Sequence, residues 1–230
     1  MKKAAEIFEN ITDKSIERKP VVVMNGEIFV RCHEMANQAS IRLLEKYGLE
    51  VILGMPSQWL EYVNKDSIEK YKERNDWKGY IASVLKGKYM KRLNERLYAP
   101  VSNFLEGRKP HDPKSMINNA QKELIYEKRV GGESVLSISE TYLFSKGKLK
   151  DICGIYHVGP FGCMQETLAT SKIQSIIQNR RLKAKTKNEK IIPFMDAVFG
   201  ESELPNLEAE IAAFAEKCYL KKEMNKKNSK

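Results

Sequence analysis

The turn around Cys163 holds the side chain of this sequence that is best placed for chemistry. Cys163 ends the segment GPFGC (159–163), which follows the apolar run DICGIYHV (151–158) and precedes a helical pattern that starts at Met164. The N-terminus of a helix carries partial positive charge, which favours the thiolate form of a cysteine. Because a thiolate binds metal ions and attacks electrophiles, Cys163 could be a metal ligand or a nucleophile. The alternative is an accessible thiol without a role.

Other polar residues belong to loops that we expect near Cys163. Glu27 and Glu133 each follow a glycine, and each could hydrogen-bond within a site or stabilise a helix N-terminus. Arg31 could bind a phosphate or an acidic partner, or pair with a neighbouring carboxylate. His33 is the best candidate partner for the thiol. Asp196, expected at the end of the last strand, could contact a ligand or form a cap or turn.

The other cysteines do not complete a metal site by their spacing. The chain has no C-x-x-C pair, so a self-contained zinc site is not expected. Cys153 and Cys163 flank one predicted strand, whose ends lie about 20 Å apart, too far for one four-ligand cluster. We expect Cys153 and Cys218 in the core, whereas Cys32 follows the first strand on the Cys163 side. A cluster shared across a dimer or with a missing domain stays open.

The composition predicts a globular protein. Of the 230 residues, 42% are hydrophobic and 30% are charged, and no segment is of low complexity. No apolar run approaches the ~18 residues of a membrane span, and the N-terminal segment indicates an amphipathic helix instead of a secretory signal. We therefore expect a cytoplasmic protein that does not bind a membrane.

The positive charge is concentrated in the middle of the chain. The net charge is +10, and residues 65–130 hold 16 basic and 9 acidic residues. Solvated helix faces, an acidic protein partner or a phosphate-bearing ligand would each account for this excess. Nucleic acid is not expected as a partner, because the sequence has no aromatic RNA-binding motif, zinc finger or Gly-x-x-Gly loop.

Strands and helices alternate along most of the sequence. Apolar, β-branched runs predict strands at 20–26, 49–55, 151–158 and 189–199. Helical patterns occupy 34–48, the segment after a Ser57 N-cap, 131–147, 164–180 and 206–222. Charged stretches at about 64–128 predict a helical insert. We expect an α/β domain: a Rossmann-like, open, mostly parallel sheet with helices on both faces. Its ligands would lie beyond the carboxyl ends of the strands, where the loops 26–31, 159–163 and 196–206 should meet.

Several stretches resemble a known family in residues and in order. They are PVVVMNGEIFVR, GLEVILGMPSQWLEY, GGESVLSISE, GIYHVGPFGCM, and the pair IIPFMD and NLEAEIAAFAE. The sequence resembles the C-terminal half of the 2-hydroxyacyl-CoA dehydratase-like proteins, in the branch related to acyl-CoA dehydratase activases. The likeness covers most of the chain outside 64–128, and GPFGCM is its most specific part.

The resemblance implies an iron–sulfur protein of anaerobic metabolism. In that family, tandem Rossmann-like domains hold a [4Fe–4S] or related cluster, and some members dehydrate 2-hydroxyacyl-CoA after an ATP-driven activase supplies an electron. Others reduce small substrates. By resemblance Cys163 is a cluster ligand and Glu27, Arg31 and Glu133 line the same edge. The resemblance also implies a set of residues that shape the turn: Gly159, Pro160, Phe161, Gly162 and Met164.

The sequence departs from the family in one large respect. The N-terminal half, with its own ligand cysteines and a Cys-x-Pro-x-Lys motif, is absent, and no nucleotide site such as G-x-G-x-x-G or a P-loop is present. We therefore expect residues 1–230 to form a single domain that is the C-terminal half of a two-domain architecture. It could be a fragment, a separate subunit or a remnant, and a second domain, a subunit or a second copy would complete it.

Three functions remain as hypotheses. The first is a redox component that ligates a cluster through Cys163 and passes low-potential electrons toward an acyl-CoA or small substrate; as an enzyme it would belong to a (R)-2-hydroxyacyl-CoA dehydratase-like lyase or an ATP-driven reductase. The second is a non-catalytic module that docks an activase or another partner through its basic insert. The third is a thiol-dependent enzyme.

Overall fold

A computed structural model describes residues 2–13, 15–54, 56–102, 112–124, 132–149, 152–185 and 191–228. The chain divides into two compact units. The first comprises residues 1–18 and 55–114, and its described elements are helices. The second comprises residues 19–54 and 115–230 and contains the sheet. Parts of the insert expected at about 64–128, namely 103–111 and 125–128, lie outside the described residues.

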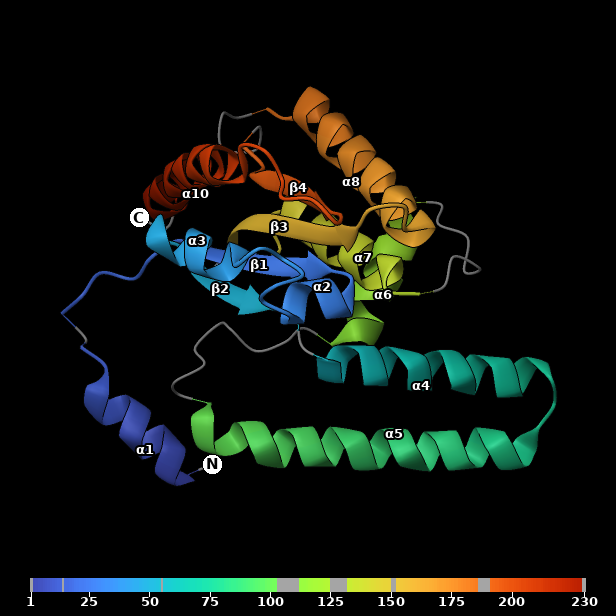
Figure 1. Cartoon of the computed structure of the whole chain (residues 1–230). Helices are drawn as coiled ribbons and strands as arrows, with labels where there is room; N and C mark the ends of the chain where they lie inside the picture. Colours follow the sequence, from blue (N-terminus) through green and yellow to red (C-terminus); the bar gives the residue numbers. More distant parts are fainter. Residues whose placement is uncertain are drawn as a thin grey trace. The chain divides into compact units, whose positions relative to one another are not determined.

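The second unit is built on a four-stranded parallel sheet with the order β2-β1-β3-β4 (Figure 1). The strands are β1 (Val21–Gly26), β2 (Glu50–Leu53), β3 (Ile152–Pro160) and β4 (Phe194–Phe199). The chain moves from β1 to β2 on one side and later returns to β3 on the other side of β1. The expected open, Rossmann-like α/β sheet is therefore confirmed, and its topological switch point lies between β1 and β3.

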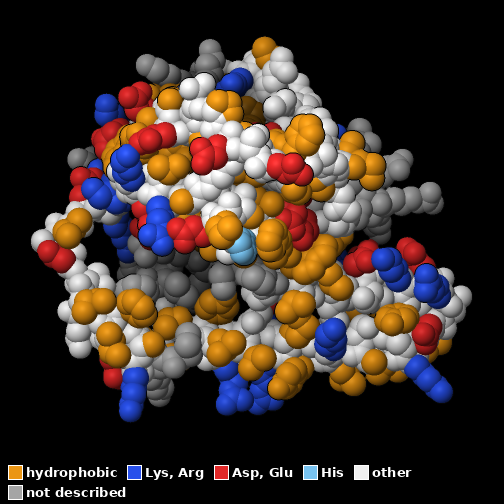
Figure 2. Space-filling model, in the orientation of Figure 1, with side chains coloured by type: hydrophobic (Ala, Val, Ile, Leu, Met, Phe, Trp, Pro, Cys, Tyr) orange, Lys and Arg blue, Asp and Glu red, His pale blue; other side chains and the backbone are white. Residues whose placement is uncertain are grey.

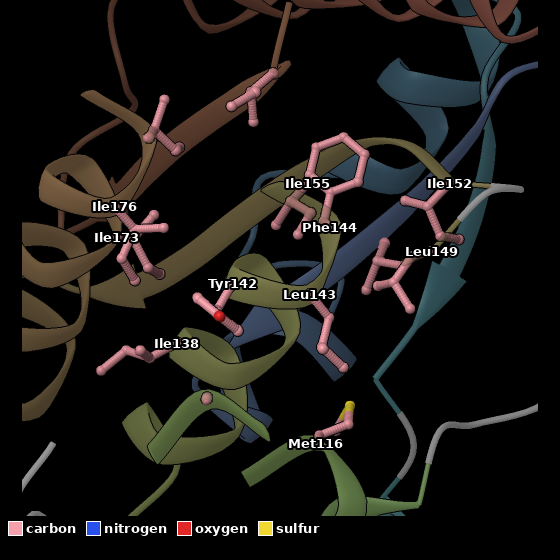
Figure 3. Close-up of a cluster of buried hydrophobic side chains, with 14 of the residues drawn as sticks. Met116, Ile138, Tyr142, Leu143, Phe144, Leu149, Ile152, Ile155, Ile173 and Ile176 are labelled. Carbon is pink, nitrogen blue, oxygen red and sulfur yellow. The ribbon is translucent and has the colours of Figure 1, made fainter. Parts of the chain in front are cut away.

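Helices cover both faces of this sheet. The helices α6 (Pro113–Leu124), α7 (Ser134–Ser145) and α8 (Met164–Lys183) contribute to one apolar cluster, which includes Val23 and Ile155. Figure 3 shows part of this cluster, with Ile173 of α8 and Tyr142 of α7 near Ile155 of β3. The helices α3 (Ser40–Lys46) and α10 (Leu207–Asn228) cover the other face. In β1 and β3, alternate residues are thus buried on opposite faces, as near-continuous apolar runs require.

The last inward positions of β1 and β3 change from apolar to polar. On the α7 and α8 face, Val23 is followed two residues later by Asn25, and Ile155 is followed by His157. The sheet register pairs Asn25 with His157. The carboxyl end of this face therefore presents two adjacent buried polar side chains at the switch point.

The first unit contains a long helical hairpin. The elements of this unit are α1 (Lys2–Ile11), α4 (Pro56–Glu73), α5 (Trp77–Tyr98) and η1 (Ala99–Val101), and α4 and α5 form the hairpin. The hairpin turn is fixed by Asp76, whose carboxylate accepts from Gly79 N at 3.0 Å and so caps α5. Between the two helices, Asn64 donates to the Ser83 carbonyl at 3.0 Å. No helix in the described ranges is long and apolar enough to cross a membrane.

The structure corrects several local predictions. The segment 27–33, expected as a loop, contains the short helix α2 (Ile28–Cys32), because the Glu27 side chain caps its free N–H groups. The helix expected from residue 34 begins only at Ser40, since Gln38 and Ala39 have positive φ. Leu44 is the fully buried leucine of this helix.

Two expected boundary residues lie inside elements instead of at their ends. Ser57, expected as an N-cap, lies within α4, which begins at Pro56. Asp196 is the third of six residues in β4, so it does not end the strand. Its β3 neighbour in the register is His157.

Candidate functional site

The ends of β1 and β3 meet at a position where only glycine fits. Gly26 has φ +106°, and a Cβ atom there would lie 1.9 Å from the Val158 carbonyl oxygen. The next residue, Glu27, donates its backbone N–H to that same oxygen at 2.9 Å. The chain can leave β1 at this angle because glycine tolerates the conformation and adds no atoms. This close approach fixes the loop 26–31 against the end of β3.

Three buried side chains from three elements form a hydrogen-bonded chain behind this junction. Asn25 of β1 donates through Nδ2 to Glu140 Oε2 of α7 at 3.0 Å. The other end of the amide, Oδ1, lies 2.9 Å from His157 Nδ1 of β3. All three side chains are buried, His157 completely. A buried polar group is costly unless it is satisfied, so this chain is held in one arrangement.

Glu166 extends the polar chain to α8. Its Oε2 atom lies 2.9 Å from His157 Nε2, and both side chains are almost fully buried. The contact is short but is not aligned as a hydrogen bond, and neither atom has another partner among the described residues. Gly159 leaves room for this arrangement, because a Cβ there would lie 2.9 Å from Glu166 Cβ and Cγ.

The loop after β1 is held by carboxylates at its edges. Glu27 accepts from Phe29 N at 3.0 Å and from Val30 N at 2.7 Å. Glu133, at the N-cap of α7, accepts from Ile28 N at 2.9 Å. Both residues therefore hold α2 in place at the switch point.

Arg31 is turned into this loop and is buried. Its Nη1 donates to the Gly26 carbonyl at 2.9 Å. Its Nε has no hydrogen-bond partner within the described part of the chain. In this structure the guanidinium group therefore contacts the backbone of its own loop.

Burial shifts the carboxyl groups of this region toward their protonated forms. It raises the pKa of Glu140, against the opposing hydrogen bond from Asn25. It also raises the pKa of Glu133 and of Asp196. Asp196 accepts a hydrogen bond from Thr170 Oγ1 of α8 at 3.2 Å. The cause in all three cases is that a carboxylate loses hydration when it is buried.

The Cys163 turn lies on the rim of the same edge. Gly159 and Pro160 end β3, Phe161 N donates to the Phe199 carbonyl at 2.7 Å, and Gly162 has φ +80°. Cys163 is the N-cap residue of α8 and is partly exposed, and its thiol makes no capping hydrogen bond. The flanking Phe161 and Met164 are 83% and 74% exposed. The rim thus combines an accessible thiol with two large apolar side chains.

The contacts that the structure gives for His33 and for the other cysteines do not include Cys163. His33 is exposed, stacks on Phe29 with ring centroids 4.9 Å apart, and accepts from Ala36 N at 3.4 Å. Cys153 and Cys218 are buried on the α10 face, as expected, and Cys32 is exposed at the end of α2.

The described residues offer a partial donor set for an iron–sulfur cluster. In the ranges that the structure describes, no group of three or more His, Cys, Asp or Glu side chains is arranged to hold a metal ion. The thiol of Cys163 fits one ligand position at a rim, and a four-ligand cluster needs further cysteines from elsewhere.

Sequence analysis did not place Asn25, Glu140, His157 or Glu166 in the site. The signal for two of them was local: Asn25 and His157 interrupt apolar alternation at equivalent places in two strands. The partners on α7 and α8 could not be found in this way, because Glu140 lies 115 residues from Asn25.

Comparisons with protein-family models, with curated proteins and with solved structures each found no match for this chain.

Proposed function

We propose that this chain is one component of an iron–sulfur redox system, in which Cys163 supplies one ligand to a [4Fe–4S] or related cluster. The remaining ligands come from a second domain, a second subunit or a second copy of the chain. The sequence resemblance to 2-hydroxyacyl-CoA dehydratase-like proteins supports this proposal, and so does the position of Cys163 beside the topological switch point.

The observation that carries the proposal is the combination of features on the rim. Cys163 is partly exposed at the N-terminus of α8, and Phe161 and Met164 beside it expose most of their apolar surface. A ligand of a shared cluster must lie at such a surface, where a partner can reach it. Covering Phe161 and Met164 would exclude water from the cluster, and burial is one of the factors that set its potential.

The chain's own residues would hold the ligand in place. The turn is anchored by the hydrogen bonds from Phe161 N to Phe199 O at 2.7 Å and from Cys163 N to Pro160 O at 3.2 Å. When bound, the cluster would supply low-potential electrons, delivered by an ATP-dependent activase and passed to an acyl-CoA or small substrate. The system would then act as a (R)-2-hydroxyacyl-CoA dehydratase-like lyase or an ATP-driven reductase.

The test is the iron and acid-labile sulfide content per chain after strictly anaerobic purification and reconstitution. Wild type, Cys163→Ala and Cys32→Ser are treated side by side, with Cys218→Ala as a buried control. We expect cluster iron in the wild type and its loss in Cys163→Ala. Equal cluster iron in these two proteins would contradict the ligand role of Cys163, and negligible iron in both would contradict assembly of the cluster on this chain or between two copies of it.

A second function is favoured by one feature of the first unit, the exposed apolar side chains of α5. Exposed large side chains recur every four residues on this helix: Trp77, Ile81, Leu85, Tyr89, Leu93 and Leu97. Figure 2 shows hydrophobic side chains intermixed with Lys and Arg over the helices of this unit. A non-catalytic module that docks an acidic partner, such as an activase, would use such a surface.

The docking alternative has its own test. Binding of a purified candidate activase is measured by calorimetry for the wild type and for Leu85→Glu with Tyr89→Glu. Docking through α5 predicts that the double variant loses binding while keeping its helical circular dichroism. Unchanged binding would exclude this surface. Cys163→Ala serves as the matched control, since it leaves α5 intact.

A further inference from the structure

The side-chain amide of Asn25 determines which ring nitrogen of His157 carries a hydrogen. Asn25 donates through Nδ2 to Glu140, so its Oδ1 atom faces His157 Nδ1 at 2.9 Å. An amide oxygen only accepts hydrogen bonds, so Nδ1 must carry the hydrogen. Any further change in protonation of His157 therefore occurs at Nε2, on the side of Glu166.

The contact between His157 Nε2 and Glu166 Oε2 admits one proton. The two atoms are 2.9 Å apart and buried. Without a proton, two lone pairs would face each other; with a proton on each atom, two hydrogens would collide. With one proton the pair is an imidazolium and a carboxylate, or a neutral imidazole and a carboxylic acid, and both forms have zero net charge.

We propose that His157 and Glu166 form a buried acid–base pair that holds a single exchangeable proton beneath the Cys163 turn. The charged and titratable groups around the pair come from every element at this edge: Arg31 from α2, Glu133 and Glu140 from α7, and Asp196 from β4. This role goes beyond ligation by Cys163 and uses residues that ligation does not need.

Glu166 departs from the local rule for its position, which indicates a role other than capping. It lies three residues after the N-cap residue Cys163, where a glutamate commonly bonds back to the N-cap N–H. Here the Cys163 N–H donates to Pro160 O at 3.2 Å instead, and Glu166 is turned inward to His157. A buried pair of ionisable groups costs desolvation that an apolar pair would avoid.

The proton count is tested on the metal-free chain, so its failure and a failure of the cluster proposal are separate results. The chain has three histidines, and His33→Gln with His111→Gln leaves His157 as the only ¹⁵N-histidine signal in nuclear magnetic resonance. Nitrogen shifts report which ring nitrogens carry hydrogen. The infrared difference between this protein and its Glu166→Gln variant reports whether Glu166 is a carboxylic acid. Glu216→Gln, an exposed carboxylate on α10, is the matched control.

The expected result is that Nδ1 is protonated and that one of two signals is present: a protonated Nε2 or a carboxylic-acid band from Glu166. Either one supports the pair and says which partner holds the proton. Both signals together, neither signal, or a bare Nδ1 would overturn the proposal. If Glu166→Gln does not fold, ¹³C labelling of glutamate carboxyl groups in the parent protein identifies the band instead.

Discussion

The two faces of the sheet bury similar amounts of apolar side chain but end in different chemistry. On the α7 and α8 face, the carboxyl-terminal halves of β1 and β3 carry Asn25 and His157, which contact Glu140 and Glu166 respectively. On the α3 and α10 face, the equivalent end of β3 carries Tyr156, whose hydroxyl lies 2.9 Å from Ser40 Oγ. One face therefore ends in ionisable groups and the other in neutral hydroxyls.

Burial raises the pKa of acidic groups on both faces of the sheet, but the consequences for their charge differ. It raises the pKa of Tyr156 and of Cys218, which moves these weak acids further from neutral pH and keeps them uncharged. It also raises the pKa of Glu140, which moves a carboxyl group toward neutral pH. The same desolvation makes one face inert and prepares the other for proton exchange.

The largest loss of stability is expected at the junction of β1 and β3, because both faces of the sheet depend on it. Gly26→Ala places a Cβ atom 1.9 Å from the Val158 carbonyl oxygen at φ +106°. We expect a loss on the order of 3 kcal/mol or more in the free energy of unfolding, measured by urea denaturation. Gly162→Ala is the control: it has φ +80° but open space, and should cost about 1 kcal/mol. Equal losses would contradict the close-approach argument.

The ionisable face should make stability depend on pH with a definite sign. Because the pKa of Glu140 is raised in the folded state, the folded chain holds its proton more tightly than the unfolded chain. The contribution of Glu140 to the free energy of unfolding is therefore fully present below the ordinary carboxyl pKa, and it is lost as pH rises through the raised value. Glu140→Gln should flatten this fall in urea denaturation at a series of pH values.

Glu208 on α10 provides a control of opposite sign. Its hydrogen bond from Lys46 lowers the pKa of this exposed carboxyl group, so Glu208→Gln should change only the acid limb of the stability curve. If Glu140→Gln and Glu208→Gln change the same limb, the distinction between the two faces is wrong.

The smallest loss of stability is expected from a substitution on the α3 and α10 face. Tyr156→Phe removes the hydroxyl that lies 2.9 Å from Ser40 Oγ, while Ser40 keeps the Asn37 carbonyl as a partner. We expect a loss of about 1 kcal/mol in the free energy of unfolding, with an unchanged pH profile. A changed profile would show that this face also exchanges protons.

The sheet and its long helices could be predicted from the sequence because their patterns are local. The runs before Gly26 and Gly159 are mostly apolar and β-branched, and α8 buries Ala169, Ile173 and Ile176 on one side. The short helix α2 could not be predicted, because five residues form a helix here only with the Glu27 cap and the Glu133 contact.

The candidate site, like the fold, could be predicted from the sequence only where the pattern is local. The position of Cys163 on the rim follows from strand and helix boundaries that are visible in the sequence. The buried, hydrogen-bonded side chains could not be predicted in this way, because Asn25, Glu140 and Glu166 come from three separate elements and have no fixed spacing. Asp196 was expected at a strand end, and the register places it beside His157 instead.

The central claim is that Cys163 ligates an iron–sulfur cluster, and the most direct measurement is low-temperature electron paramagnetic resonance of anaerobically reconstituted, chemically reduced protein. Wild type, Cys163→Ala and Cys163→Ser are compared at equal protein concentration. The account predicts a cluster signal in the wild type, its loss in Cys163→Ala, and a shifted signal in Cys163→Ser, where oxygen replaces sulfur as the ligand. No cluster signal in the wild type, or the same signal in all three proteins, would contradict it.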